Sequence, residues 1–134
     1  MNLFEVICAR RSVVSIANKN IDKENNIDKI PVALKYKLVK FLKETDGDEE
    51  FFQKQLNELI EQYAERDDEG KPVTNNSDGV KVKVEYQDEC ADKIKELHNI
   101  RTEHAQKFLT LSDIENLSIS YSDMEGLYPF IKEE

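Results

Sequence analysis

Residues 31–66 read PVALKYKLVKFLKETDGDEEFFQKQLNELIEQYAER, and this stretch decides the fold that we expect for the chain. Apolar side chains recur along it every three or four positions, which is the spacing of one buried stripe on an amphipathic helix. Pro31 suits a first helical turn, because its missing N–H removes no intrahelical hydrogen bond there. Gly47 lies in the middle at a cost of about 1 kcal/mol against alanine. The apolar stripe keeps its phase across Gly47, so the pattern predicts one unbroken helix.

Shorter patterns flank this helix on both sides. Apolar residues at helical spacing over 3–17 predict an N-terminal helix, and a polar, asparagine-rich connector follows at 21–30. The segment VKVKV at 80–84 alternates strictly and predicts a strand with its lysines outward. A further helix is expected over 86–107, with FLTL at 108–111 as a second strand.

Together these patterns predict a single domain, 1–134, which is the size of one ordinary domain. We expect the α+β class, mostly α, with an N-terminal helix in 1–20 and the polar connector in 21–30. Residues 31–134 are expected to hold an antiparallel hairpin of two long helices, a small β element of two or three strands, and C-terminal capped turns.

The C-terminal tail repeats itself, because SDIENL returns ten residues later as SDMEGL. Each copy has the pattern of a capping box, Ser112 with Glu115 and Ser122 with Glu125, in which serine and glutamate accept each other's amide N–H. We expect two short capped turns, and a docking motif for a partner is the alternative. The turns would dock four apolar side chains on the core: Ile114, Leu117, Met124 and Leu127.

Composition describes an acidic protein without an apolar span. The net charge is -9, and 39% hydrophobic with 35% charged residues suits long helices that bury one stripe. No apolar run approaches the ~20 residues of a membrane span, and Glu5, Arg10 and Arg11 interrupt the N-terminal stretch too early for a secretory signal. Cys8 and Cys90 are expected to be small buried side chains in a reducing compartment.

The stretch TNNSDGVKVKVE at 74–85 nearly matches the calcium loop of an EF-hand. Its first ligand position holds Thr74 in place of aspartate, and a hard cation needs more carboxylate oxygens than this loop offers. Lys81 also stands where an apolar residue usually pairs with a second hand. We therefore interpret the stretch as a hairpin with its turn at 77–79.

No constellation of residues for catalysis stands out. His98 and His104 lack the i, i+4 spacing of a zinc-binding helix, and there is no glycine-rich phosphate loop or nucleophile elbow. Basic patches with interleaved aromatic residues are missing from the sequence as well. We therefore expect no enzymatic activity, no catalytic residues, no metal or cofactor and no direct binding of nucleic acid.

The negative charge is concentrated in one place. Residues 44–69 hold eleven acidic and two basic side chains, whereas LKYKLVKFLK at 34–43 holds four lysines and no acid. The long helix is thus basic near its N-terminus and acidic near its C-terminus, the reverse of what the helix macrodipole favours. We interpret this as charge complementarity between molecules. The candidate interaction surface consists of Asp46, Glu50, Glu58, Glu61, Glu65, Lys35, Lys37 and Lys40.

This charge layout suits several partners. An antiparallel or head-to-tail homo-oligomer would set acidic ends against basic ends, a basic partner protein is a second possibility, and a merely solubilising surface is a third. The acidic segment 44–69 would also imitate a nucleic-acid backbone, in which case binding falls steeply with salt.

Three segments resemble a family of short uncharacterised proteins, a domain of unknown function, encoded by phages and prophages of Gram-positive bacteria. The segments are 33–38, 52–70 and 117–131, and the second carries the pattern F-x6-L-I-x2-Y-x-E-x-D-x2-G. The resemblance brings no activity and no functional residue. It implies an accessory or structural phage protein that contacts itself or another phage or host protein, in the host cytoplasm or associated with the virion. The alternative function is a host-takeover or counter-defence protein that binds a host factor through the acidic helix face, as a mimic of nucleic acid.

Overall fold

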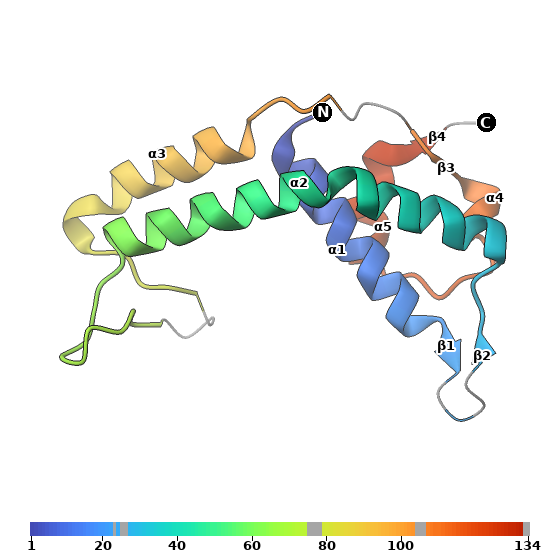
Figure 1. Cartoon of the computed structure of the whole chain (residues 1–134), viewed down its shortest axis with the longest axis horizontal. Helices are drawn as coiled ribbons and strands as arrows, with labels where there is room; N and C mark the ends of the chain where they lie inside the picture. The colour runs from blue at the N-terminus through green and yellow to red at the C-terminus, as the bar shows by residue number, and fades with distance from the viewer. Residues whose placement is uncertain (23, 25–26, 75–78, 104–106, 133–134) are drawn as a thin grey trace.

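The computed structural model describes residues 1–22, 24, 27–74, 79–103 and 107–132. Among these residues the long helix α2 (Val32–Tyr63) extends across the molecule, and α1 (Leu3–Lys19) crosses near its middle (Figure 1). The C-terminal helix α5 (Tyr121–Leu127) packs against α1, while α3 (Gln87–His98) lies beside the C-terminal half of α2. The prediction of a mostly helical α+β protein is therefore confirmed.

Helix α1 begins at a capping box formed by two residues that are close in sequence. The Asn2 side chain accepts the Glu5 N–H at 2.9 Å, and the Glu5 carboxylate accepts the Asn2 N–H at 3.2 Å. The helix ends at Lys19, and the buried side-chain amide of its C-cap residue Asn20 donates to the carbonyls of Ile16 and Ser118. The predicted N-terminal helix is confirmed, and Asn20 ties its end to the C-terminal tail.

Helix α2 is continuous through Gly47, as the apolar periodicity predicts. Pro31 lies at the N-cap, one position before the first helical residue. The helix ends at Tyr63, three residues before the expected end, because the chain then pairs with 80–83. There the Lys83 N–H donates to the Tyr63 carbonyl at 3.0 Å, and the Glu65 N–H donates to the Lys81 carbonyl at 2.8 Å.

The connector after α1 contains two short strands. Strand β1 (Ile21–Asp22) pairs antiparallel with β2 (Ile27–Asp28), and the Lys29 N–H donates to the Asn20 carbonyl at 2.9 Å. Residues 21–22 and 27–28 of the polar segment are therefore paired, and the polar composition does not reveal this backbone pairing.

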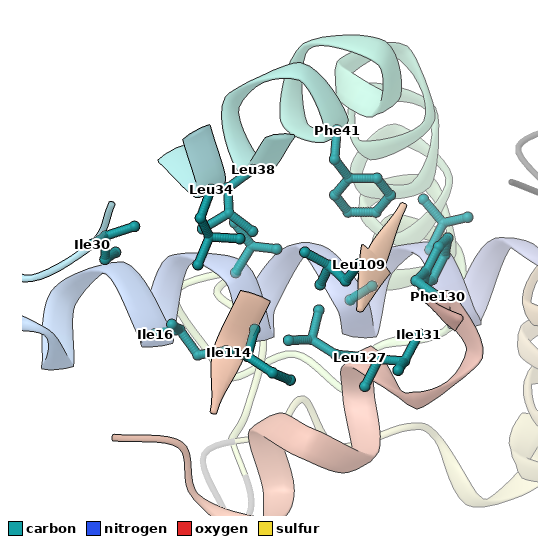
Figure 2. Close-up of a cluster of buried hydrophobic side chains, with 13 residues drawn as sticks. Ile16, Ile30, Leu34, Leu38, Phe41, Leu109, Ile114, Leu127, Phe130 and Ile131 are labelled. Carbon is teal, nitrogen blue, oxygen red and sulfur yellow. The ribbon is translucent and has the colours of Figure 1, made fainter. Parts of the chain in front are cut away.

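The core lies between α1, the N-terminal half of α2 and the C-terminal tail (Figure 2). Phe41 stacks on Phe108 at 4.7 Å between ring centroids and meets Phe130 edge-on at 5.1 Å. Ile114 and Leu127 are buried in this core, and Leu117 and Met124 pack against it in part. The predicted docking of the tail is confirmed.

The predicted capping residues of the tail are wrong by two positions. Helix α4 (Leu111–Ile114) has Thr110 as its N-cap, with a capping box to Asp113, and α5 has Ser120, which accepts the Asp123 N–H at 3.1 Å. Thr110 ends strand β3 (Leu109–Thr110), so the helix starts directly after it. At α4 the shift arises because a tertiary strand pairing fixes where the helix begins.

The second long helix is not confirmed, and with it the hairpin of two long helices. Helix α3 has 12 residues in place of the expected range 86–107. After His98 the chain pairs with the N-terminus: the Leu3 N–H donates to the Ile100 carbonyl at 2.8 Å, and the Thr102 N–H to the Met1 carbonyl at 2.9 Å. This extended pairing is incompatible with a continuing helix.

The strand expected at 80–84 is wrong as well. Val80 and Val82 form only isolated antiparallel bridges, with Thr74 and Ala64, and η1 (Val84–Tyr86) follows at once as a 3-10 turn. Positions 77 and 78 of the expected turn lie outside the described residues.

The FLTL strand is present in shortened form. Strand β3 pairs in parallel with β4 (Ile131–Lys132), which follows the 3-10 turn η2 (Tyr128–Phe130), with Leu109 opposite Ile131. The described residues therefore hold two separate two-stranded sheets, β1–β2 and β3–β4, in place of one β element.

Candidate interaction surface

The face of α2 turned away from the core is divided into two halves of opposite net charge. At 3.6 residues per turn, one arc of the helix carries the exposed side chains of both halves, opposite Leu38, Phe41 and Phe52. We term the first set the basic half: Val32, Lys35, Tyr36, Val39, Lys40 and Lys43. We term the second set the acidic half: Glu50, Glu58 and Glu61.

The basic half exposes large apolar side chains between its lysines. Val32 is 79% exposed, Tyr36 68% and Val39 48%, and they follow one another at i, i+4 and i+7. Residues at this spacing are neighbours on one side of a helix. Neighbouring exposed apolar side chains are a feature of protein-binding surfaces. The N-terminal half of α2 is therefore apolar on the side that faces the core and partly apolar on the side that faces solvent.

Three of the eight predicted surface residues act inside the chain. Asp46 accepts from Arg10 at 3.0 Å, and Lys37 donates to Asp113 at 2.8 Å. Glu65 lies beyond the end of α2 and meets Lys81 at 3.3 Å. The pairs of Asp46 and Lys37 join α2 to partly buried partners on neighbouring segments, so these two charges are largely satisfied within one molecule.

The other five predicted residues lie on the exposed face of α2: Lys35, Lys40, Glu50, Glu58 and Glu61. Lys40 meets Glu44 at 4.0 Å and Glu61 meets Arg66 at 3.5 Å, both between exposed side chains. Exposed ion pairs of this kind contribute little, about 0–1 kcal/mol. These pairs leave the side chains able to bind another molecule.

The acidic half does not reproduce the regular spacing of phosphates. Glu50, Glu58 and Glu61 are eight and three residues apart, or about 12 and 4.5 Å along the axis. Lys54 lies among them on the same face, whereas DNA carries an uninterrupted row of negative charges. This irregular spacing weakens the interpretation of the acidic segment as an imitation of a nucleic-acid backbone.

A groove beside the basic half was not expected from the sequence. It has a volume of about 980 Å³ and lies between α2 and two distant segments that contribute Lys107 and Lys132. Four lysines and two glutamates line it, and Phe41, Phe108 and Phe130 form its aromatic wall. No sequence signal reveals this groove, because Lys107 and Lys132 follow the two lysines of α2 by about 70 to 95 residues and meet them only in the folded protein.

A second cavity, of about 540 Å³, lies between α1 and α5. The half-buried Cys8 lines it, and burial raises the pKa of this thiol, while Arg11 opposes the shift. Cys90 is buried, and burial likewise raises its pKa. The expectation of buried cysteines therefore holds for Cys90 and only in part for Cys8.

The described residues contain no group of three or more histidine, cysteine, aspartate or glutamate side chains placed to hold a metal ion. Within the same residues no helix has the length and apolar character for crossing a membrane. Asn76 and Asp78, which belong to the stretch that nearly matches a calcium loop, lie outside the described residues. No protein-family model, curated protein or solved structure matches the chain.

Proposed function

We propose that this chain is a non-catalytic protein that acts by protein–protein contact, and that its partner is a second copy bound antiparallel along α2. The division of one exposed helix face into a basic and an acidic half carries the proposal. The proposed setting is a phage or prophage, in which the protein is an accessory or structural component. That setting rests on the sequence resemblance alone.

An antiparallel arrangement pairs both halves at once. A two-fold axis near Gly47, the middle of the 32-residue helix, sets each basic half against the acidic half of the other copy. Apart from the two adjacent residues and the backbone of α2 itself, no atom lies within 4 Å of the position that a Cβ on Gly47 would take, so the face is open there. Two backbones can approach closely at a residue without a side chain.

The helix macrodipole favours the same arrangement. Within one molecule the lysines lie toward the positive end of α2 and the glutamates toward its negative end, which is unfavourable. In an antiparallel pair, the glutamates of each copy lie beside the positive end of the other helix. An arrangement that is electrostatically poor in the monomer is thereby improved in the dimer.

The exposed apolar row adds a contribution that does not depend on charge. Val32, Tyr36 and Val39 leave water when the second helix covers them, at about 25 cal/mol per Å² of apolar surface buried. The ionic part of the contact weakens as salt screens the exposed charges. We therefore expect a dimer that salt weakens but does not abolish.

A charge-exchange experiment tests this proposal. One variant, Lys40→Glu with Lys43→Glu, makes both halves acidic, and the other, Glu50→Lys with Glu58→Lys, makes both halves basic. Each variant alone is expected to be monomeric in analytical ultracentrifugation at low salt, because like charges face each other. An equal mixture is expected to form a heterodimer.

Two outcomes would overturn self-association. The first is a wild-type mass that stays monomeric at high concentration and low salt. The second is a mixture of the two variants that does not associate although the wild type does. A monomeric wild type would leave the host-factor binder as the alternative, to be tested by binding of a basic protein to the acidic half.

A further inference from the structure

The lysine-lined groove beside α2 has the features of a pocket for an aromatic side chain with acidic neighbours. Its aromatic wall consists of side chains that pack against one another, with Phe41 on Phe108 at 4.7 Å and Phe108 near Phe130 at 5.8 Å. Exposed Tyr36, Lys107 and Lys132 stand at its rim. Lys37 is bound to Asp113, so the other lysines of the groove are the ones that can meet a ligand's carboxylates.

We infer that this groove receives Phe51 of the second copy, an inference that rests on the proposed self-association. Phe51 is a large apolar side chain on α2 that is 45% exposed. Glu50 precedes it, and Glu58 lies two turns further along the same side of the helix. The ring of Phe51 matches the aromatic wall, and Glu58 matches the lysines of the groove, which outnumber its two glutamates.

Helical geometry places Phe51 on the flank of α2 that carries the groove. Lys40 and Phe51 are eleven residues apart, so they project within about 20° of each other around the axis. Tyr36 and Glu58 are each eleven residues from Gly47, one on either side. A two-fold axis at Gly47 therefore brings Glu58 of one copy opposite Tyr36 of the other, at the rim of the groove.

The same axis places Phe51 at the inner end of the groove. Phe51 lies four residues after Gly47, so it comes opposite position 43 of the second copy, next to Glu44, which lines the groove. An aromatic side chain in a pocket, surrounded by polar contacts that exclude water, is the usual anchor of an interface. Phe51 supplies the anchor, and Lys107 and Lys132 supply positive charge from outside α2.

The chain contains no tryptophan, so Phe51→Trp introduces a single indole as a reporter. We expect its fluorescence maximum to move to shorter wavelength as concentration rises through dimerisation, because the indole enters the groove. The matched control is Tyr121→Trp on α5, where the native side chain is 86% exposed and lies outside the groove. Its emission is expected to be independent of concentration.

Variants of the groove test the other side of the contact. Lys107→Glu with Lys132→Glu, and separately Phe51→Ala, are each expected to raise the dimer Kd by about tenfold or more. Lys93→Glu with Lys95→Glu reverses two exposed lysines of α3, away from the groove, and is expected to leave the Kd unchanged. Circular dichroism and thermal unfolding of each variant confirm that it is folded.

The outcomes separate this inference from the proposed function. If the charge-exchange mixture dimerises but the groove variants leave the Kd unchanged, or the Phe51→Trp indole stays exposed in the dimer, the groove is not the pocket. If the wild type does not associate at all, both proposals fail. A blue shift of the Phe51→Trp indole that Lys107→Glu with Lys132→Glu abolishes supports the inference.

Discussion

Arg10 of α1 binds Asp46 of α2 at 3.0 Å, and the same guanidinium donates to the Leu42 carbonyl and to Thr45 Oγ1, both at 2.7 Å. Thr45 is fully buried, and its hydroxyl donates to the Phe41 carbonyl at 2.7 Å. One arginine thus fixes the crossing of the two helices. This relationship explains why Asp46, although acidic and on α2, contributes to the packing of α1 on α2 and not to the acidic half.

Replacing Arg10 is therefore expected to be costly. Arg10→Ala removes charge-assisted hydrogen bonds from a buried threonine and a main-chain carbonyl, and we expect a loss of about 2 to 3 kcal/mol in unfolding free energy. Arg10→Lys is expected to be intermediate, since an ammonium cannot reproduce the planar fork. Lys40→Ala, on the exposed face, serves as the control and is expected within about 0.5 kcal/mol. Urea unfolding measures all three, and equal effects of Arg10→Ala and Lys40→Ala would contradict the assignment.

Asp123 is expected to contribute to acid sensitivity. Burial alone would raise the pKa of Asp123, but hydrogen bonds from Lys19, Ser15 and Ser120 outweigh burial and hold the pKa below its usual 3.8. A carboxyl with a lowered pKa stabilises the fold above its unfolded pKa, and this contribution is lost as the pH falls through the folded value. Unfolding free energy measured from pH 6 to pH 2 is expected to fall less steeply in Asp123→Asn. An unchanged slope would show that Asp123 does not contribute.

A second loss of stability, at a pH closer to neutral, is expected from protonation of His98. Its ring stacks on Phe4 at 4.3 Å and lies 5.9 Å from the ring of Phe52, and burial lowers the pKa of His98 from 6.5. The unfolded chain therefore takes up a proton first, so stability present above pH 6.5 is lost as the pH falls through the folded pKa. His98→Phe keeps the aromatic stack and is expected to remove this dependence. Unfolding curves at pH 7.5 and pH 5 compare the two proteins.

Gly126 allows the close approach of α5 to α1. A Cβ at this position would collide with Ser12 Oγ and lie 3.1 Å from the Cys8 carbonyl oxygen. Gly126→Ala is therefore expected to destabilise the protein by about 1 to 3 kcal/mol, although alanine favours an isolated helix. Adding Ser12→Ala removes the nearest atom and is expected to restore part of the loss. No restoration in thermal unfolding would show that the collision with Ser12 is not the cause.

Gly47→Ala separates the stability of the monomer from that of the dimer. The site has open space around it, so alanine is expected to stabilise α2 by up to about 1 kcal/mol. Under the proposed antiparallel contact, the same methyl group holds two helices apart and raises the dimer Kd. A more stable protein with an unchanged Kd, measured by ultracentrifugation, would show that the helices do not cross at Gly47.

The sequence by itself determined α1 and α2, because their signals are local. Apolar residues at helical spacing specify one buried stripe whatever the rest of the chain does, and a single glycine costs too little to break a long helix. The division of α2 into basic and acidic halves likewise follows from the charged residues of the segments 34–43 and 44–69. The docking of Ile114 and Leu127 is also predicted by a local pattern, because a short helical turn with an apolar side is stable only when that side is buried against the core.

Only the tertiary structure decided where the other elements end and which charges stay on the surface. Helix α3 stops at His98 because the N-terminus offers an extended partner, and α4 starts after Thr110 because β4 pairs with β3. Asp46 forms an ion pair with Arg10, and Lys37 forms one with Asp113; both partners are distant in sequence. Competition between local propensity and long-range hydrogen bonds fixes these features, and the energy of the long-range partner is absent from any short stretch of sequence.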